Sequence, residues 1–226
     1  MDMSMMSTNL PSWVSPVAWV FLALALVSAA VIAVDIWVRG HRHPRLATEL
    51  VWVGSALYLG PFALALYVRS QRITRASKRD SAAAGRPDQR HAVTDALPGG
   101  TASAVAHLIG VPLVIASGLT IAGIDLWVMI IVIAVLATIL LFIYDRSTTT
   151  LPVSVALGAA VLTVVAFDIG MGGWMLLLHF NELMPAATEG SFWFLMQIGI
   201  VLGLITGYPV IAWLARRRAV PAPLTA

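Results

Sequence analysis

The chain has 226 residues, of which 59% are hydrophobic and 11% are charged, and it contains no cysteine. Soluble domains carry about 25% charged residues, so this composition excludes an ordinary water-soluble domain. The lack of cysteine excludes disulfides, thiolate metal sites and cysteine nucleophiles. The net charge of +3 does not indicate nucleic-acid binding, because the basic residues flank apolar segments. We expect an all-α integral membrane protein forming a single domain, residues 1–226, with no nucleic-acid partner.

Six apolar segments are long enough to cross a bilayer core, which requires about 20 helical residues. They cover residues 13–38, 48–69, 101–122, 125–145, 153–181 and 191–215. The second contains Gly60-Pro61, and a proline inside a span leaves a carbonyl that only protein or trapped water can satisfy. We therefore expect a kink there against neighbouring helices. An even number of spans predicts that both termini lie on the same side.

The basic residues predict which side that is. With both termini in the cytoplasm, 11 of the 14 Lys and Arg residues lie inside, and Arg39, Arg42 and Arg45 lie outside. Because positive charge favours the cytoplasmic side, we expect a multi-pass protein of the inner (plasma) membrane with cytoplasmic termini. The polar segment 70–99 is predicted to be a mobile cytoplasmic loop that anionic lipid of the inner leaflet attracts.

The connection between the first two segments, RGHRHPR, contains His41 and His43. Two imidazoles at this position could bind a metal ion at the membrane surface. A solvated turn is the simpler interpretation.

The sharpest polar signal is Asp168, near the middle of the fifth apolar segment. An ionised acid at the bilayer centre costs at least about 2.5 kcal/mol on insertion scales, so such a residue is a functional candidate. One role is a proton or cation site. The other is a protonated acid that is hydrogen-bonded to a neighbour such as Gln197 of the sixth segment and holds two helices together.

Four residues continue from Asp168 at helical spacing and are expected to share its face: Met171, Met175, His179 and Glu182. Thioethers and imidazole suit Cu(I), whereas carboxylates suit harder ions or protons. The row therefore predicts a path for an ion, with a copper-like metal ion as one candidate. Ordinary packing of methionine between helices is the alternative.

His107, in the third segment, is expected nearer the inner side. There it could relay a proton below Asp168 or pack as a neutral, hydrogen-bonded imidazole. His179 is expected at a different depth, so a haem shared by the two histidines is not favoured.

Glycines repeat every four residues in the sixth segment, at Gly199, Gly203 and Gly207. Such a ridge lets another helix approach closely. It is predicted to pack against the fifth segment, or else to form the face of a homo-oligomer.

Several blocks resemble the bacterial membrane family known as domain of unknown function 4396. They are ALYLGP (Ala56–Pro61), AFDIGMGGWM (Ala166–Met175), FWFLMQIG (Phe192–Gly199) and GYP (Gly207–Pro209). The resemblance extends from about Val34 to Arg217. Relatives look as if they carry a segment with His and Cys before the third span, but residues 94–101 here read TDALPGGT and lack cysteine. The family has no established activity, so the resemblance implies the fold and no substrate.

The functional hypothesis is a small cation transporter, for a metal ion or a proton, that uses Asp168. The alternative is a non-catalytic membrane scaffold or an accessory subunit of a larger complex. A membrane redox enzyme with a bound cofactor is the least favoured hypothesis. The sequence has no P-loop, GxSxG, HExxH or Rossmann motif, so enzymes of the soluble type are not indicated.

Overall fold

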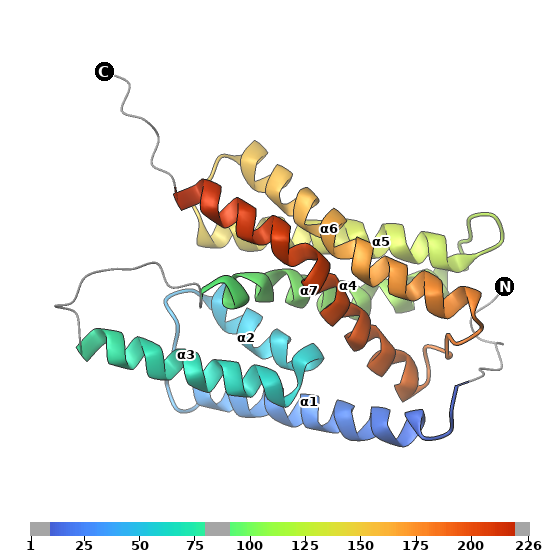
Figure 1. Ribbon diagram of the computed structural model, residues 1–226, viewed down its shortest axis with the longest axis horizontal. Coiled ribbons are helices and arrows are strands. Elements are labelled where there is room, and N and C mark those ends of the chain that lie inside the picture. The colour runs from blue at the N-terminus through green and yellow to red at the C-terminus, as the bar shows by residue number, and fades with distance from the viewer. Residues whose placement is uncertain (1–9, 80–90, 220–226) are drawn as a thin grey trace.

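The computed structural model describes residues 10–79 and 91–219, and within them the chain is all-α (Figure 1). Seven helices follow one another: α1 (Val14–Trp37), α2 (Leu46–Leu59), α3 (Pro61–Arg79), α4 (His91–Ser117), α5 (Asp125–Thr148), α6 (Val153–Phe180) and α7 (Gly190–Ala219). Five of them are long and apolar enough to cross a membrane. The expectation of an α-helical membrane protein is therefore confirmed.

The five candidate spans are α1, the Ala96–Ser117 part of α4, α5, α6 and the Gly190–Arg217 part of α7. They correspond to all of the expected segments except the second. The third was expected over 101–122, but α4 begins earlier and ends at Ser117. It ends there because Gly118 adopts a φ of +64°, the left-handed conformation that terminates many helices.

The second expected span is not one helix. Gly60, with a φ of +57°, ends α2, and Pro61 begins α3 in a new direction. The rings of Trp52 in α2 and Tyr67 in α3 meet edge to face, with centroids 5.4 Å apart. The two helices therefore form a hairpin, and α2, at about 21 Å, is too short to cross a core of about 30 Å. The expected count of six spans is not confirmed.

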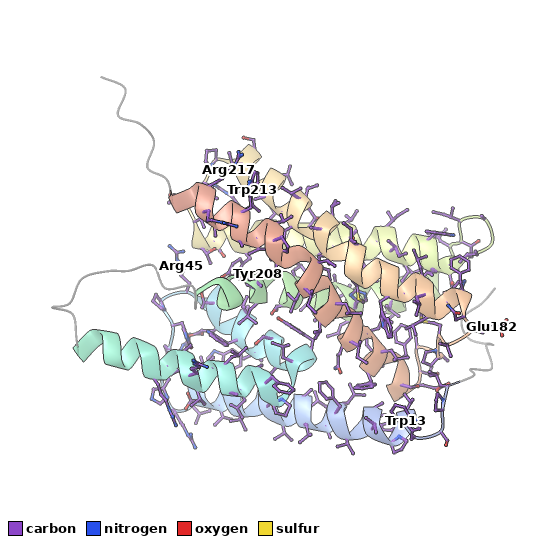
Figure 2. All side chains as sticks on the ribbon, in the orientation of Figure 1. Trp13, Arg45, Glu182, Tyr208, Trp213 and Arg217 are labelled. Atoms are coloured by element: carbon purple, nitrogen blue, oxygen red, sulfur yellow. The ribbon has the colours of Figure 1, made fainter. Side chains whose placement is uncertain are left out.

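The hairpin returns to the end of the bundle from which it started, as Figure 1 shows for α2 and α3. The Tyr67 hydroxyl of α3 donates a hydrogen bond of 2.8 Å to Asp35, near the C-terminal end of α1. From that end, α4 to α7 cross the bundle four times. Arg45 and Arg217 therefore lie at one end of the molecule, and Trp13 and Glu182 lie at the other (Figure 2). The start of α1 and the end of α7 are at opposite ends, so the expectation of both termini on one side is not confirmed.

One end of the bundle, called here the basic end, carries the positive charge. It comprises the α1–α2 and α5–α6 connections, the C-terminal part of α3 and the end of α7. All twelve Lys and Arg residues in the described part of the chain lie there; the other two, Arg86 and Arg90, are outside the described residues. The sequence interpretation had divided the charge between two sides, because it counted the hairpin as a crossing.

The helices next to the basic end are longer than expected. The segment 70–99 was predicted to be a mobile loop, but α3 continues to Arg79 and α4 begins at His91. Alanine, arginine and lysine, which are frequent in this segment, have high helix propensity. Only residues 80–90 lie outside the described part of this segment.

Two clusters of buried side chains hold the helices together. The larger joins α4, α5, α6 and α7, and the smaller joins α1 to the hairpin. In α5, buried residues recur every four positions, at Met129, Ile133, Ala137 and Leu141. The opposite face of α5 exposes large apolar side chains with the same period, as expected of a helix with one side toward lipid.

Candidate functional site: a cavity at the hairpin tip

The tip of the hairpin is attached to α7 by a side chain. In a continuous helix, the Leu57 carbonyl would accept a hydrogen bond from the N–H of residue 61, but that residue is proline and has no N–H. Instead, Gln197 of α7 donates its side-chain amide to the Leu57 carbonyl oxygen at 2.7 Å. The expectation that Pro61 frees a carbonyl is confirmed, although the chain reverses there instead of kinking. Gln197 thus bonds to the hairpin, and not to Asp168 as had been considered.

A cavity of about 420 Å³ lies beside this tip. Side chains of α1, α2, α4 and α7 enclose it, among them Tyr58, His107, Trp193 and Gln197. The helix α2 packs against both α1 and α4, whose backbones do not come close to each other within the described residues. Because the hairpin ends partway along the bundle, the space between α1 and α4 beyond its tip is left partly open.

His107 lies at the centre of the membrane-spanning part of α4 and is 3% exposed. It was expected about a third of the way along its segment, and it is at the middle of this candidate span because α4 begins and ends earlier than the sequence indicated. Its Nδ1 is 2.8 Å from the carbonyl oxygen of Ser103, and since a carbonyl can only accept, Nδ1 carries the proton. Nε2 then has a free lone pair, and within the described residues this buried atom has no hydrogen-bond partner.

Asp168 lies apart from the cavity. Its side chain is half-buried at the edge of the buried face of α6, and its neighbours Val165 and Ile169 are 57% and 68% exposed. Its carboxylate makes no hydrogen bond or ion pair with the described residues. One turn later, a Cβ atom added at Gly172 would meet nothing within 4 Å. Asp168 therefore lies at the margin between the buried and the exposed faces of α6.

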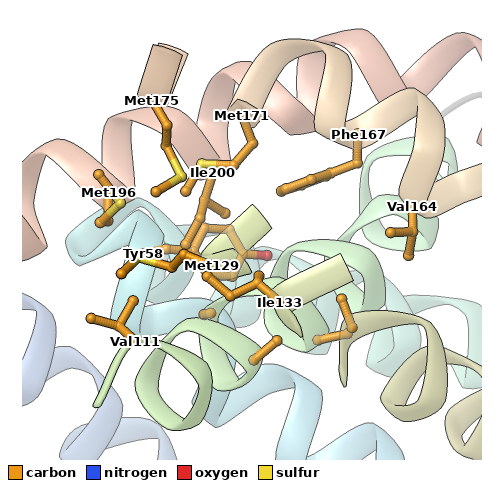
Figure 3. Packing of buried hydrophobic residues seen from close by; sticks show 14 of the residues in the cluster. Tyr58, Val111, Met129, Ile133, Val164, Phe167, Met171, Met175, Met196 and Ile200 are labelled. Carbon is orange, nitrogen blue, oxygen red and sulfur yellow. The ribbon is translucent and has the colours of Figure 1, made fainter. Parts of the chain in front are cut away.

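Met171, Met175 and His179 share the buried face of α6, as expected from their spacing. Figure 3 shows Met171 and Met175 packed near Met196 of α7 and close to Tyr58. This arrangement brings thioethers together in the core. The described residues contain no group of three or more His, Asp or Glu side chains that could hold a metal ion.

Glu182 is not part of the row on α6. The helix ends at Phe180, and Glu182 follows it with a φ of +57° and an exposed side chain. The helical spacing that placed it beside His179 therefore does not apply. His179 itself is buried, and its Nδ1 has no partner among the described residues.

The glycine ridge of α7 packs against α6 of the same chain. A Cβ atom at Gly203 would lie 2.6 Å from the ring of Phe167, and one at Gly199 would collide with the Met171 sulfur. A Cβ atom at Gly207 would lie 3.7 Å from the backbone of Phe167. The expected contact between these helices is present, so this ridge offers no free face to a second copy; a homo-oligomer would use another surface.

At the basic end, Glu49 is fully buried and accepts three hydrogen bonds. The donors are the Trp37 indole at 3.1 Å, the Arg42 guanidinium at 2.7 Å and the backbone N–H of His43 at 2.9 Å. Burial lowers the pKa of His43 below its ordinary value, although the negative charge of Glu49 acts in the opposite direction.

The two histidines proposed as a surface metal site, His41 and His43, interact with different carboxylates. His41 is 3.0 Å from Asp35, whereas the backbone of His43 binds Glu49. They act as parts of the network that fastens the α1–α2 connection.

Sequence reasoning missed Tyr58 and Glu49. Tyr58, 1% exposed, donates a hydrogen bond of 3.2 Å to the Leu97 carbonyl oxygen and so joins the hairpin to α4. Its position just before Gly60-Pro61 was the sequence feature that could have indicated a role at the break in the helix. For Glu49 the signal was an acid just inside an apolar segment, directly after a connection rich in arginine.

The sequence model of one family, described as Domain of unknown function (DUF4396), matches residues 89–219, more than half of the chain. The chain belongs to the DUF4396 family. The DUF4396 segment contains His107, Asp168 and Gln197, whereas α1 and the hairpin precede it. The block Ala56–Pro61, which had been part of the resemblance, thus lies outside the match. Comparisons with curated proteins and with solved structures found no match.

Proposed function

We propose that this protein is a small membrane transporter for a cation, in which the α2–α3 hairpin acts as a gate. The observation that carries the proposal is the reversal of the chain at Gly60-Pro61, partway along the bundle and beside a cavity of about 420 Å³. Irregular backbone at membrane depth is tolerated only where protein buries it or where it lines a cavity, and it is common in channels and transporters. The cavity gives the hairpin space in which to move. The cation itself would bind at Asp168, which does not line the cavity.

In this proposal the basic end faces the cytoplasm. Positive charge favours the cytoplasmic side, and all the described Lys and Arg residues gather at this end. The protein would then lie in the inner (plasma) membrane with five crossing helices, the start of α1 outside and the end of α7 inside. The hairpin would enter from the cytoplasm. The basic end would meet anionic lipid, which attracts each charge near the surface by about 1 kcal/mol.

Asp168 is the group proposed to bind the cation, either a proton or a metal ion. It is a half-buried acid in the middle of a candidate spanning helix, with no partner among the described residues. Intramembrane acids of this kind commonly mark ion or proton pathways. The buried Met171, Met175 and His179 continue from it along α6 and would form the approach from the outer side.

Flux measurements with the purified protein in liposomes test this proposal. An internal pH dye reports protons, and elemental analysis of the washed liposomes reports Cu(I) and divalent metal ions. We expect flux of at least one of these cations above that of protein-free liposomes. Asp168→Asn should abolish it, whereas Gly172→Ala, one turn away where the added methyl group meets open space, should retain it. Flux equal to that of empty liposomes for every cation, or unchanged flux in Asp168→Asn, would contradict the proposal.

The accessory-subunit alternative is favoured by the same position of Asp168. A carboxylate at the margin of the exposed face of α6, between the exposed Val165 and Ile169, is suited to a polar group of a neighbouring subunit. In that case Asp168→Leu would disrupt a larger complex in native membranes without altering any flux. Blue native electrophoresis of the wild type and Asp168→Leu separates the two functions.

A further inference from the structure

The cavity beside the hairpin tip has an unusual balance of hydrogen-bonding groups. Several polar side chains on its wall use their donors on backbone carbonyls. The Gln197 amide donates to Leu57, and the Trp193 indole donates to Ala187 at 3.0 Å. The hydroxyl of Tyr58 likewise donates to a carbonyl of α4. These residues therefore have few donors left for a ligand.

Two acceptor atoms of the same wall residues have no donor. They are Nε2 of His107 and the side-chain oxygen of Gln197, and both are buried. A buried acceptor without a partner costs about 1–3 kcal/mol, so a molecule that supplies donors to these atoms gains free energy on binding. Both atoms are covered by their neighbours, so binding requires side chains of the wall to move aside.

Among the described residues, those that line the cavity include no charged side chain. A full positive charge placed there would have no carboxylate to balance it, and an unpaired charge in an apolar site is costly. The wall does carry the aromatic rings of Trp19, Tyr58 and Trp193. These features favour an uncharged ligand with hydroxyl groups on a flat ring.

The cavity opens toward the bilayer between α1 and α4. Leu26 of α1 and Leu108 of α4 both line it, and they are 63% and 49% exposed. Within the described residues, the backbones of these two helices do not come close to each other, so they do not form a tightly packed helix pair on this side. A ligand with an apolar tail could therefore place its ring in the cavity and leave the tail among the lipid chains.

We propose that this cavity binds a lipid-soluble hydroquinone, whose hydroxyl groups donate to His107 and Gln197. The inference goes beyond the proposed transport function and does not depend on the identity of the cargo. The oxidised quinone of the same skeleton has the same ring and tail but no hydroxyl donors. Comparing the two forms isolates the hydrogen bonds from the apolar contacts.

The test is anaerobic calorimetric titration of the protein in nanodiscs with decylubiquinol and with decylubiquinone. We expect the quinol to bind roughly tenfold more tightly, which is the effect of one or two net hydrogen bonds. His107→Phe should reduce quinol affinity toward that of the quinone and leave quinone affinity unchanged. Gln197 is left intact in this test, because its amide also holds the hairpin tip. Ile200→Val, an apolar change in the same wall, should preserve the preference for the quinol.

Equal affinity for the two forms would show that the cavity holds an apolar group only, such as a lipid tail, and would overturn the inference. No binding of either form would overturn it as well. Neither result affects cation flux, which is measured without quinone. Conversely, quinol binding without any cation flux would remove the proposed transport function and leave this site in place.

Discussion

The side-chain amide of Gln197 in α7 is 2.7 Å from the carbonyl oxygen of Leu57 in α2, although 140 positions separate the two residues. This hydrogen bond supplies the donor that Pro61 lacks. It attaches the tip of the hairpin to the DUF4396 part of the chain. The carbonyl left without a donor at the helix break and the side chain that donates to it therefore lie in direct contact, although they are far apart in the sequence.

Removing this donor should destabilise the protein. In Gln197→Met the side chain keeps a similar length but cannot donate, so the Leu57 carbonyl remains buried without a partner at a cost of about 1–3 kcal/mol. Thermal unfolding in detergent measures the change. Ile198→Met, which alters the neighbouring apolar residue of α7, is the matched control. Equal stability of the two variants would show that the hydrogen bond does not hold the hairpin tip.

The glycine ridge predicts opposite effects for two glycine substitutions. Gly203→Ala should destabilise by about 1–3 kcal/mol, because its Cβ would lie 2.6 Å from the Phe167 ring and α6 and α7 would have to separate. Gly172→Ala, where nothing lies within 4 Å, should be neutral or stabilise by up to about 1 kcal/mol through helix propensity. Unfolding temperatures of the two variants check this, and the reverse order would contradict the observed contact of α6 with α7.

The network at the basic end should also contribute to stability. Glu49→Ala removes the acceptor of three hydrogen bonds and leaves the indole of Trp37 and the backbone N–H of His43 without their partner. We expect a clear loss of stability, since hydrogen bonds to charged groups are stronger than those between neutral groups. Arg45→Ala, an exposed residue of the same connection, should change stability by less than about 0.5 kcal/mol. Similar losses in the two variants would contradict the role of Glu49.

The lowered pKa of His43 predicts that the free energy of unfolding depends on pH. Burial lowers its pKa below the ordinary value of 6.5, against the opposing effect of Glu49, so the unfolded chain binds a proton more readily than the folded protein. This contribution to stability is complete above pH 6.5 and is lost as the pH falls toward the lowered pKa. Unfolding temperatures measured from about pH 7.5 to pH 5 should fall more steeply for the wild type than for His43→Asn. Equal slopes would contradict the prediction, because the other histidines are the same in both proteins.

Hydropathy predicted the helices that can cross the membrane, since α1, α5, α6 and α7 each follow one long apolar segment. The glycine spacing also predicted a contact that is present, because a row of small residues leaves room for a neighbouring helix. These features depend on local sequence, and the structure has them where the pattern indicated.

The hairpin could not be predicted in the same way. The segment around Gly60-Pro61 is apolar and long enough to cross a bilayer, and the same dipeptide fits a kink or a reversal. What distinguishes the two is tertiary: the ring contact of Trp52 with Tyr67 and the hydrogen bond from Gln197. The signal that was missed is the position of Arg39, Arg42 and Arg45, which a six-span topology places on the less favoured side.

For the site, periodicity placed Met171, Met175 and His179 on one buried face, but it continued the helix too far and so included Glu182. The end of α6 depends on the left-handed conformation of Glu182, which the sequence does not indicate. The cavity is formed by four helices that are distant in sequence, so no local pattern could reveal it.

The central claim, that the chain reverses at Gly60-Pro61, is tested most directly by the position of the α1–α2 connection. The protein has no cysteine, so single cysteines can be introduced and labelled with a membrane-impermeant maleimide in oriented vesicles. Three exposed positions serve as labelling sites: Pro44 in that connection, Thr150 between α5 and α6, and Thr120 between α4 and α5. We predict that Pro44→Cys is labelled from the same side as Thr150→Cys and from the side opposite to Thr120→Cys. Labelling of Pro44→Cys from the same side as Thr120→Cys would show that residues 48–69 cross the membrane, and would contradict the account.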